Sequence, residues 1–485
     1  MEIHLVIHGR QNLSTQLYRQ LRAAILDGRL APGERLPSTR DLATQLGVSR
    51  KTTLDVYDQL SAEGYLTTHR GDGTFVADGL SKRPGAPSTS PPAPRATPRA
   101  LWGSLPEAIA MPAQGAVLPI DFMGGVTDKR LFPFDSWRRC IAHALRVQAR
   151  GRGTYRDPAG DQELRLAVSR YLGFSRAIAS NWQDVLITQG AQQALDLMAR
   201  VIVGPGDVVA VEEPGYPPAR ACFMALGAQV VPVPVDGEGL VVAALPKNAR
   251  LVYVTPSHQF PLGMPMSLGR RIELLEWARH CGAVIIEDDY DGEYRFEGRP
   301  MEPLKSLDRE GLVAYVGTFS KTIFPELRIG YLLPPAPLFG PLVKARQIGD
   351  WHGCALTQTA LAKFMLDGDF AKHLRRMHGH YAARRRVLLG HLAGDLAPWL
   401  DPVIAAAGIH LVARLRGDLS EAAVIGAARE MGIGFYGLAG FHAGPPAVRG
   451  LLFGYGAIDE QDIDTALTRL ASLLPTFPRE GDLSA

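Results

Sequence analysis

The chain has 485 residues, 46% of them hydrophobic, which is ordinary globular composition in a length too great for one compact core. We therefore expect two or three domains. The formal net charge of +3 excludes a general polyanion binder, so any nucleic-acid binding depends on local placement of charge. The cysteines have no short metal-type spacing, which predicts reduced thiols and no metal site. No uncharged run approaches membrane-spanning length, so we predict a cytoplasmic protein without a membrane partner.

Residues 11–78 have the helix and strand signals of a winged helix-turn-helix. A first helix with leucines at helical spacing precedes the breaker pair at 32–33. Ser38 is the predicted N-cap of a second helix, and Ser49 is the predicted N-cap of a third. Two short strands then surround a hairpin tip at 69–73, which completes the pattern.

A unit of this kind places its third helix in the major groove while flanking groups hold phosphates. We therefore predict a double-stranded DNA operator as its partner. A protein-interaction module is the alternative, because isolated patterns of this kind also occur without DNA binding. The candidate DNA contacts are Arg40, Ser49, Arg50, Thr52 and Thr53 on the helices and Arg70, Gly71 and Gly73 on the wing.

Residues 79–115 have the composition of a linker. Prolines punctuate Ser, Ala and Thr from Pro84 to Pro98. Such a segment buries too little apolar surface to offset the entropy of ordering, so we predict a semi-extended, flexible tether between two folding units.

Residues 116–478 predict an α/β domain with a smaller part after it. Between about 160 and 340, apolar runs alternate with helical stretches, which indicates a largely parallel sheet covered by helices on both faces. From about 350 to 478, Arg-rich helices followed by Gly-rich short strands predict a smaller α+β subdomain. The predicted strands of the large part are Val185–Thr188, Val208–Val211, Val230–Val235, Leu251–Thr255, Ala283–Glu287 and Val313–Gly317.

Two motifs predict a pyridoxal phosphate (PLP) site: IIEDDYDGEYR at 285–295 and GTFSKTIFPELRIGY at 317–331. Lys321 has the amine that forms a Schiff base with an aldehyde cofactor. Asp288 has the carboxylate that keeps the pyridine nitrogen protonated, and Tyr290 can hydrogen-bond the ring hydroxyl. A phosphate needs positive charge and hydroxyl donors. The residues predicted to meet it are Arg328, Ser320 and Thr318.

The run PGERLPSTRDLATQLGVSRKTTLDVYDQLSAEGYL resembles the winged-helix head of the GntR family. The chain from Asp121 to about Leu474 resembles a fold-type I aminotransferase, and the fusion resembles the MocR subfamily of transcriptional regulators. The resemblance implies a winged helix-turn-helix joined by a Pro-rich linker to an aminotransferase class I/II-like α/β domain that holds PLP on Lys321.

The same resemblance implies a homodimer with shared sites, because Tyr155 matches a segment through which the neighbouring subunit reaches the phosphate. Further cofactor-binding residues that it implies are Gly190, Ala191 and Gln192 at a helix start, Tyr216 stacked on the ring, and His258 in the place of an asparagine beside the ring.

One position departs from the aminotransferase pattern. Aminotransferases hold the substrate α-carboxylate with an arginine in a short strand near the C-terminus, and Leu452 occupies that slot here. Ordinary α-amino-acid transamination should then be inefficient, because catalysis depends on holding the reacting bond in line with the ring. The candidates for contacting an effector carboxylate instead are Arg449 and Arg220.

The leading hypothesis is a PLP-dependent transcriptional regulator whose aminotransferase-like domain senses PLP itself or a small amine or amino acid. The alternative is a catalytically active PLP-dependent aminotransferase with an accessory DNA-binding head. A third interpretation is a cofactor-free scaffold that only dimerises the heads. The complete helix-turn-helix and Leu452 both disfavour turnover as the main role.

Overall fold

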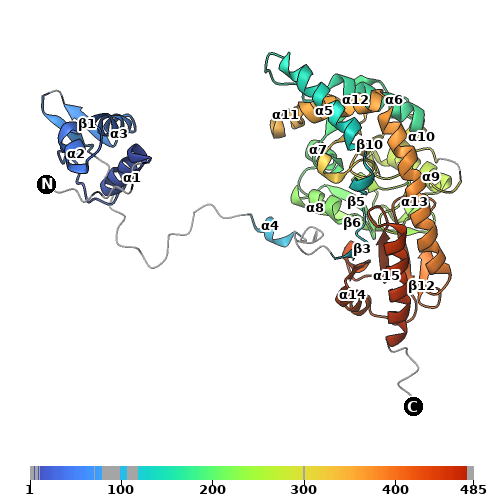
Figure 1. Cartoon of the computed structure of the whole chain (residues 1–485). Coiled ribbons are helices and arrows are strands. Elements are labelled where there is room, and N and C mark those ends of the chain that lie inside the picture. Colours follow the sequence, from blue (N-terminus) through green and yellow to red (C-terminus); the bar gives the residue numbers. More distant parts are fainter. Residues whose placement is uncertain are drawn as a thin grey trace. The chain divides into compact units, whose positions relative to one another are not determined.

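The computed structural model divides the chain into two compact units, residues 1–98 and residues 99–485 (Figure 1). In the described part of the chain, no helix is long and apolar enough to cross a membrane. The structure describes residues 11–69, 71–78, 99–105, 118–298 and 301–477, together with Leu5 and Gly9.

The first unit is a three-helix head with a β-hairpin, as the sequence predicts. Its elements are α1 (Leu13–Leu26), α2 (Thr39–Leu46), α3 (Arg50–Ala62), β1 (Leu66–His69) and β2 (Gly73–Val76). Leu21 of α1, Leu42 of α2 and Leu60 of α3 are fully buried in one core. The two strands pair antiparallel, with Leu66 opposite Val76.

Side-chain caps fix where the second and third helices begin. The Ser38 hydroxyl accepts from the backbone N–H of Asp41 at 3.2 Å, and the Ser49 hydroxyl accepts from that of Thr52 at 3.0 Å. Each bond satisfies a donor that the first turn of a helix leaves unpaired. Gly47 ends α2 in the left-handed region with φ of 64°. Both predicted N-caps are therefore present.

The predicted linker lies largely outside the described residues. Where it is described, Ala100–Ser104 forms the short helix α4 instead of an extended tether. The segment ALWGS contains no proline, so its backbone N–H groups can close a helical turn.

The second unit is built on an eight-stranded sheet. In spatial order its strands are β4 (Leu186–Thr188), β11 (Gly330–Leu333), β10 (Val313–Thr318), β9 (Val284–Asp289), β8 (Ala249–Val254), β5 (Val208–Glu213), β6 (Gln229–Asp236) and β7 (Gly239–Leu240). The strands from β10 to β6 are parallel, whereas β11 runs antiparallel to both β10 and β4. All six predicted strands are present, and the other two strands of the sheet, β11 and β7, were not predicted.

Helices cover both faces of this sheet (Figure 1). They are α5 (Phe134–Ala149), α6 (Gln162–Arg176), α7 (Ala191–Ile202), α8 (Pro217–Ala225), α9 (Leu268–Cys281), α10 (Leu304–Leu307), α11 (Ala336–Asp350) and α12 (Ala355–Leu366). Consecutive strand residues face opposite sides, so Ile285 packs with α9 and Ile286 packs with α7, α8 and α11. The α5, α6 and α12 helices share the α9 side of the sheet.

A smaller α+β subdomain follows. Its helices are α13 (Asp369–Ala393), α14 (Glu421–Glu430) and α15 (Glu460–Leu473), and its antiparallel sheet has the order β12 (Leu400–Val403), β13 (His410–Leu415), β16 (Gly450–Gly454) and β15 (Tyr436–Gly437). Helix α12 and Phe370 in the first turn of α13 pack on the large sheet, and the later part of α13 packs with the elements of the smaller subdomain.

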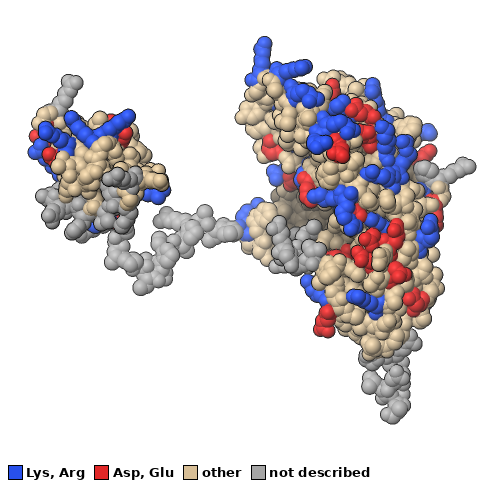
Figure 2. All heavy atoms as spheres, viewed as in Figure 1, with Lys and Arg blue, Asp and Glu red and all other residues tan. Residues whose placement is uncertain are grey.

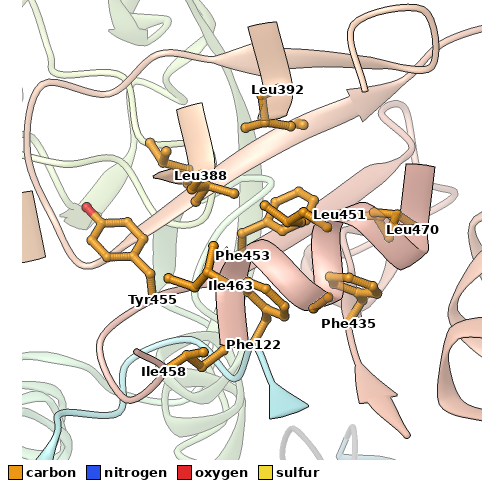
Figure 3. Packing of buried hydrophobic residues seen from close by; sticks show 14 of the residues in the cluster. Phe122, Leu388, Leu392, Phe435, Leu451, Phe453, Tyr455, Ile458, Ile463 and Leu470 are labelled. Atoms are coloured by element: carbon orange, nitrogen blue, oxygen red, sulfur yellow. The ribbon is translucent and has the colours of Figure 1, made fainter. Parts of the chain in front are cut away.

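Strand β3 (Ile120–Asp121) and the residue after it pack into this smaller subdomain (Figure 3). The strand pairs with β14 (Ile433–Gly434). The next residue, Phe122, stacks on Phe435 with ring centroids 5.0 Å apart and meets Phe453 of β16 at 5.7 Å. This packing fixes the position of residues 123–125, which continue into the candidate site.

Charged side chains of both signs are interspersed over the face of the second unit shown in Figure 2. This distribution agrees with the small net charge of the chain.

Candidate functional site

The predicted PLP residues come from neighbouring strand ends of the large sheet. Asp288 lies near the end of β9, and Lys321 follows the end of β10, the adjacent parallel strand. Gly190 follows β4, and Gly330, the first residue of β11, pairs with Thr188 of that strand. Ligands of α/β sheets bind at the carboxyl ends of parallel strands, so these residues lie at the edge where a ligand is expected.

Lys321 contacts the segment that follows β3. Its Nζ donates to the backbone carbonyl of Gly125 at 2.7 Å. Burial lowers the pKa of Lys321, the charges of Asp291 and Asp288 oppose this effect, and Arg328 adds to it. A lysine with a lowered pKa is more often neutral, which is the form that attacks an aldehyde.

Asp288 is a buried carboxylate that has one unpaired oxygen. Its Oδ2 accepts from the Tyr253 hydroxyl at 2.9 Å, while its buried Oδ1 has no hydrogen-bond partner among the described residues. Burial raises the pKa of Asp288 to about 7, against the lowering effect of the Tyr253 bond, and Asp289 raises it further. An unpaired buried oxygen is costly unless a donor faces it. The protonated ring nitrogen of PLP fits this requirement.

A helix end, a guanidinium group and two hydroxyl groups lie close to the lysine. Gly190 caps α7 with φ of 80°, and the first turn of a helix has N–H groups without intrahelical partners. Arg328 Nη2 donates to the Gln189 carbonyl at 2.9 Å and lies 2.9 Å from where a Cβ on Gly190 would be. Thr318 Oγ1 donates to Ser320 Oγ at 3.0 Å. These groups fit a phosphate.

The other two predicted cofactor residues of α7 come directly after Gly190 in the chain. Ala191 and Gln192 form its first turn. The Gln192 side chain donates from Nε2 to the Pro218 carbonyl at 3.2 Å, and its buried Oε1 has no partner among the described residues. Gln192 therefore ties α7 to α8, which begins directly after Tyr216.

Aromatic rings line the side of the site near Tyr290. Phe260 packs at right angles on Tyr216 and on Tyr290, with centroids 5.6 Å and 5.9 Å apart. The Tyr290 hydroxyl donates to the His258 carbonyl at 3.0 Å, and His258 Nδ1 lies 3.0 Å from Asp291 Oδ1. His258 is therefore engaged by its own chain, whereas Phe260, from the same motif, lies between the two tyrosines. Phe260 is not among the site residues predicted from the sequence.

A buried network lies behind Tyr290. His258, Asp291 and His410 each present one ligand-type atom, and these atoms all lie within 4.8 Å of one another. His410 Nε2 donates to the Pro261 carbonyl at 3.0 Å, and burial, with the neighbouring His258, lowers the pKa of His410 to about 3. Because these atoms bond to one another and to backbone, we interpret them as a network that positions Tyr290. His410 is distant in sequence, so no local motif indicates it.

Tyr155 lies on the surface of the second unit. It is 72% exposed, and its ring stacks on Trp351 with centroids 4.5 Å apart. Ile348, in the last turn of α11, is 86% exposed. Exposed apolar side chains of this size are typical of a surface that another protein covers. The position leaves Tyr155 available to a neighbouring subunit.

The two candidate effector arginines contact other parts of the chain. Arg449 is half exposed, with Nη2 3.5 Å from Asp418 Oδ1, so it is engaged by a surface carboxylate of its own chain. Arg220 Nη2 donates to the His442 carbonyl at 3.2 Å. His442 Nδ1 in turn lies 2.9 Å from Glu213 Oε1, so Arg220 helps to hold the smaller subdomain against the end of β5.

In the head, most candidate DNA contacts are accessible. Arg40 and Arg50 are exposed, and Thr52 is half buried beside its cap, Ser49. The prediction that Thr53 contacts DNA is wrong, because Thr53 is fully buried. Its hydroxyl donates to backbone carbonyls of α2 and α3 at 2.8 Å and 2.9 Å. Gly71 and Gly73 lie at the hairpin tip with positive φ, and Arg70 lies outside the described residues.

Comparison with known proteins gives the same division of the chain. Residues 13–76 match the bacterial regulatory proteins, gntR family, and residues 126–470 match aminotransferase class I and II. The chain is 37% identical to the probable rhizopine catabolism regulatory protein MocR of Rhizobium meliloti, over 96% of this chain and 95% of that protein. It is 33% identical to the HTH-type pyridoxine biosynthesis transcriptional regulator PdxR of Corynebacterium glutamicum, over 97% and 98%.

Solved aminotransferases share the fold of the second unit. Pyrococcus horikoshii kynurenine aminotransferase superposes with a TM-score of 0.69 at 28% identity, covering 77% of this chain and 93% of that chain. LysN of Thermus thermophilus, solved with N-(5'-phosphopyridoxyl)-L-leucine, superposes with a TM-score of 0.68 at 28% identity, covering 75% and 93%.

Proposed function

Because this chain belongs to the MocR type of GntR-family transcriptional regulators, in which a helix-turn-helix head is joined to an aminotransferase class I and II domain, we propose that it binds PLP through Lys321 and uses PLP or a small amine to control operator binding. The head reads double-stranded DNA in the major groove, with Arg50 at the start of α3 as its main base contact. A regulator of DNA acts in the cytoplasm.

The observation that carries the cofactor proposal is the unpaired, buried Oδ1 of Asp288 on the same sheet edge as Lys321. PLP supplies an aldehyde that reacts with a lysine amine and a ring that acts as an electron sink. Asp288 holds the ring nitrogen, Tyr290 hydrogen-bonds the ring hydroxyl, and Arg328 with the start of α7 holds the phosphate. The phosphopyridoxyl ligand of LysN, at 28% identity, supports this assignment.

The effector is either PLP itself or a small amine or amino acid that enters the Lys321 site. PdxR of Corynebacterium glutamicum is named for pyridoxine biosynthesis, which favours PLP. A ligand shifts DNA affinity only if it binds the two conformations of the protein with different affinity, and the coupling is reciprocal. Bound DNA should therefore change the affinity for PLP by the same factor.

The protein works as a homodimer in this proposal. Tyr155 is exposed next to the exposed apolar residues Trp351 and Ile348, which gives it the freedom to reach the phosphate in a second subunit. Two heads in one dimer then bind two half-sites, so operator affinity depends on both subunits.

The test is DNA binding by the full chain. Duplexes enriched from a random pool define the operator, and titration with and without PLP measures the response. Lys321→Ala should lose the PLP response and keep wild-type DNA affinity without PLP, whereas Arg50→Ala should lose operator affinity and keep PLP binding. An unchanged PLP response in Lys321→Ala contradicts the sensor role.

The second candidate function is PLP-dependent transamination with an accessory head. The fold shared with kynurenine aminotransferase favours it, and Leu452 in the place of the carboxylate-binding arginine counts against it. It predicts sustained turnover of an amino donor and a keto acceptor by the full chain. The regulator predicts at most a single slow conversion of the bound cofactor.

A further inference from the structure

Leu452 and the amine of Lys321 approach two consecutive glycines, Gly124 and Gly125. A Cβ on Gly124 would be 2.8 Å from Leu452 Cδ2, and a Cβ on the next residue, Gly125, would be 2.5 Å from Lys321 Nζ. The Gly125 carbonyl also accepts the lysine hydrogen bond at 2.7 Å. Leu452 and Lys321 Nζ therefore border the same two-residue segment, which makes Leu452 a neighbour of the amine site across Gly124 and Gly125.

The surroundings of Leu452 are apolar. In the sheet of the smaller subdomain it pairs with Val412 on one side and Tyr436 on the other, and it is 2% exposed. The buried cluster around it consists of Leu262, Met264, Val412, Leu438, Phe441 and Leu452, with Phe260 packed against it. Phe260 also contacts Tyr216 and Tyr290, so this cluster continues to the rings of the candidate site.

The nearby arginines are held elsewhere. Arg449 pairs with Asp418, and Arg220 donates to the His442 carbonyl. Arg328 donates to the backbone carbonyl of Gln189, which lies just before α7. A carboxylate brought against Leu452 would lose its hydration without gaining an ion pair, which is strongly unfavourable. An alkyl or aromatic group at the same place would bury apolar surface against the cluster, which is favourable.

Resting on the proposed function, we propose that the amine side of this site selects primary amines that carry an apolar group, and no carboxylate, next to the nitrogen. This specificity assigns to Leu452 the discrimination between simple amines and α-amino acids. It makes an arylalkyl or alkyl monoamine the effector class that fits the site, and it disfavours the α-amino acids.

The test compares matched ligands on the PLP-loaded full chain by calorimetric titration. Phenethylamine and L-phenylalanine differ only in the α-carboxylate, as do pentylamine and L-norleucine. We expect each amine to bind at least about tenfold more tightly than its amino acid. Leu452→Arg should reverse this order, and Arg449→Ala should leave it unchanged, because Arg449 faces Asp418 on the surface.

Equal or tighter binding of the amino acids to the wild type, or no binding of either class, overturns the specificity. The wild-type comparison decides the matter by itself if Leu452→Arg does not load PLP. Failure of the wild type to retain PLP is a separate result, visible before any amine is added, and it overturns the proposed cofactor rather than the ligand preference alone.

Discussion

Replacement of Asp288 by asparagine should stabilise the PLP-free protein and weaken PLP binding. The carboxylate is buried, one oxygen is bonded to Tyr253, and the other has no partner in the described part of the chain. Asparagine has nearly the same shape and no charge. The substitution therefore removes an unfavourable buried charge from the empty site and a favourable partner from the occupied one.

The size of the first effect follows from the pKa of Asp288, which burial raises from 3.8 to about 7. Below pH 4 the carboxyl is protonated in the folded and unfolded states alike. Between pH 4 and pH 7 the unfolded chain loses its proton first, so stability falls as pH rises. Above pH 7 the full loss is about 4 kcal/mol, since one pKa unit corresponds to about 1.4 kcal/mol. The Asp288→Asn variant has no carboxyl to ionise, so its free energy of unfolding does not fall in this way. Its weakened bond to Tyr253 lowers the free energy of unfolding by about 1 kcal/mol.

The assay is unfolding of the PLP-free wild type and Asp288→Asn at pH 5 and pH 8. Other buried carboxyls titrate in this range, including Glu212, whose pKa burial also raises to about 7, so the difference between the two proteins isolates Asp288. Asp289→Asn is the matched control. It removes the nearer of two carboxylate partners of buried Arg176, 3.0 Å away, leaves Glu293 at 3.7 Å, and should destabilise the protein.

The occupied site should respond in the opposite direction. A hydrogen bond to a charged group is worth about 1.5–3 kcal/mol, so Asp288→Asn should weaken PLP binding by about 10- to 150-fold. If Asp288→Asn destabilised the PLP-free protein at pH 8 as Asp289→Asn does, and left PLP affinity unchanged, the reasoning about the unpaired oxygen would be refuted.

Three further predictions concern the head, the phosphate and the dimer. Thr53→Val should destabilise the head by about 1–2 kcal/mol, because two carbonyls lose a donor, while DNA affinity of the folded protein at low temperature stays unchanged; lost affinity in a fully folded variant would restore Thr53 as a DNA contact. Arg328→Ala should weaken PLP binding by about 10- to 100-fold in a spectroscopic titration, and Arg328→Lys should recover only part of it, because lysine cannot form a bidentate pair; full recovery would argue against a bidentate contact. Tyr155→Ala should lower PLP affinity while changing unfolding stability by less than about 0.5 kcal/mol, because the side chain is 72% exposed; unchanged PLP affinity in a dimer verified by sedimentation would remove Tyr155 from the shared site.

Local signals predicted most of the fold. Ser38 and Ser49 cap their helices as expected, because capping depends on residues within one turn. Five of the six predicted strands are recognisable because each is a buried apolar run, and the sixth, β6, is a valine-rich run that is mostly half-exposed or exposed. The burial of Thr53 could also have been predicted from the sequence, because Thr53, Val56, Tyr57 and Leu60 repeat at helical spacing. All four are buried.

The surroundings of Lys321 depend on contacts that no local pattern contains. Gly125 reaches the lysine because Phe122 packs into the smaller subdomain, and Leu452, from the other end of the chain, lies against the preceding residue, Gly124. His410 joins His258 and Asp291 only through the packing of β13. Such long-range contacts cannot be predicted from a local sequence pattern. The Lys321 and Asp288 motifs, in contrast, are each a contiguous run at the end of a strand, and their two strands are neighbours in the sheet.

The visible absorption spectrum of the purified full chain after PLP addition and desalting, with Lys321→Ala alongside, shows directly whether Lys321 holds PLP. We expect a retained band of lysine-bound PLP in the wild type and its absence in Lys321→Ala, with both proteins folded by circular dichroism. A wild type that retains no band, or a Lys321→Ala variant that retains the same band, would contradict the assignment of Lys321 as the residue that holds PLP.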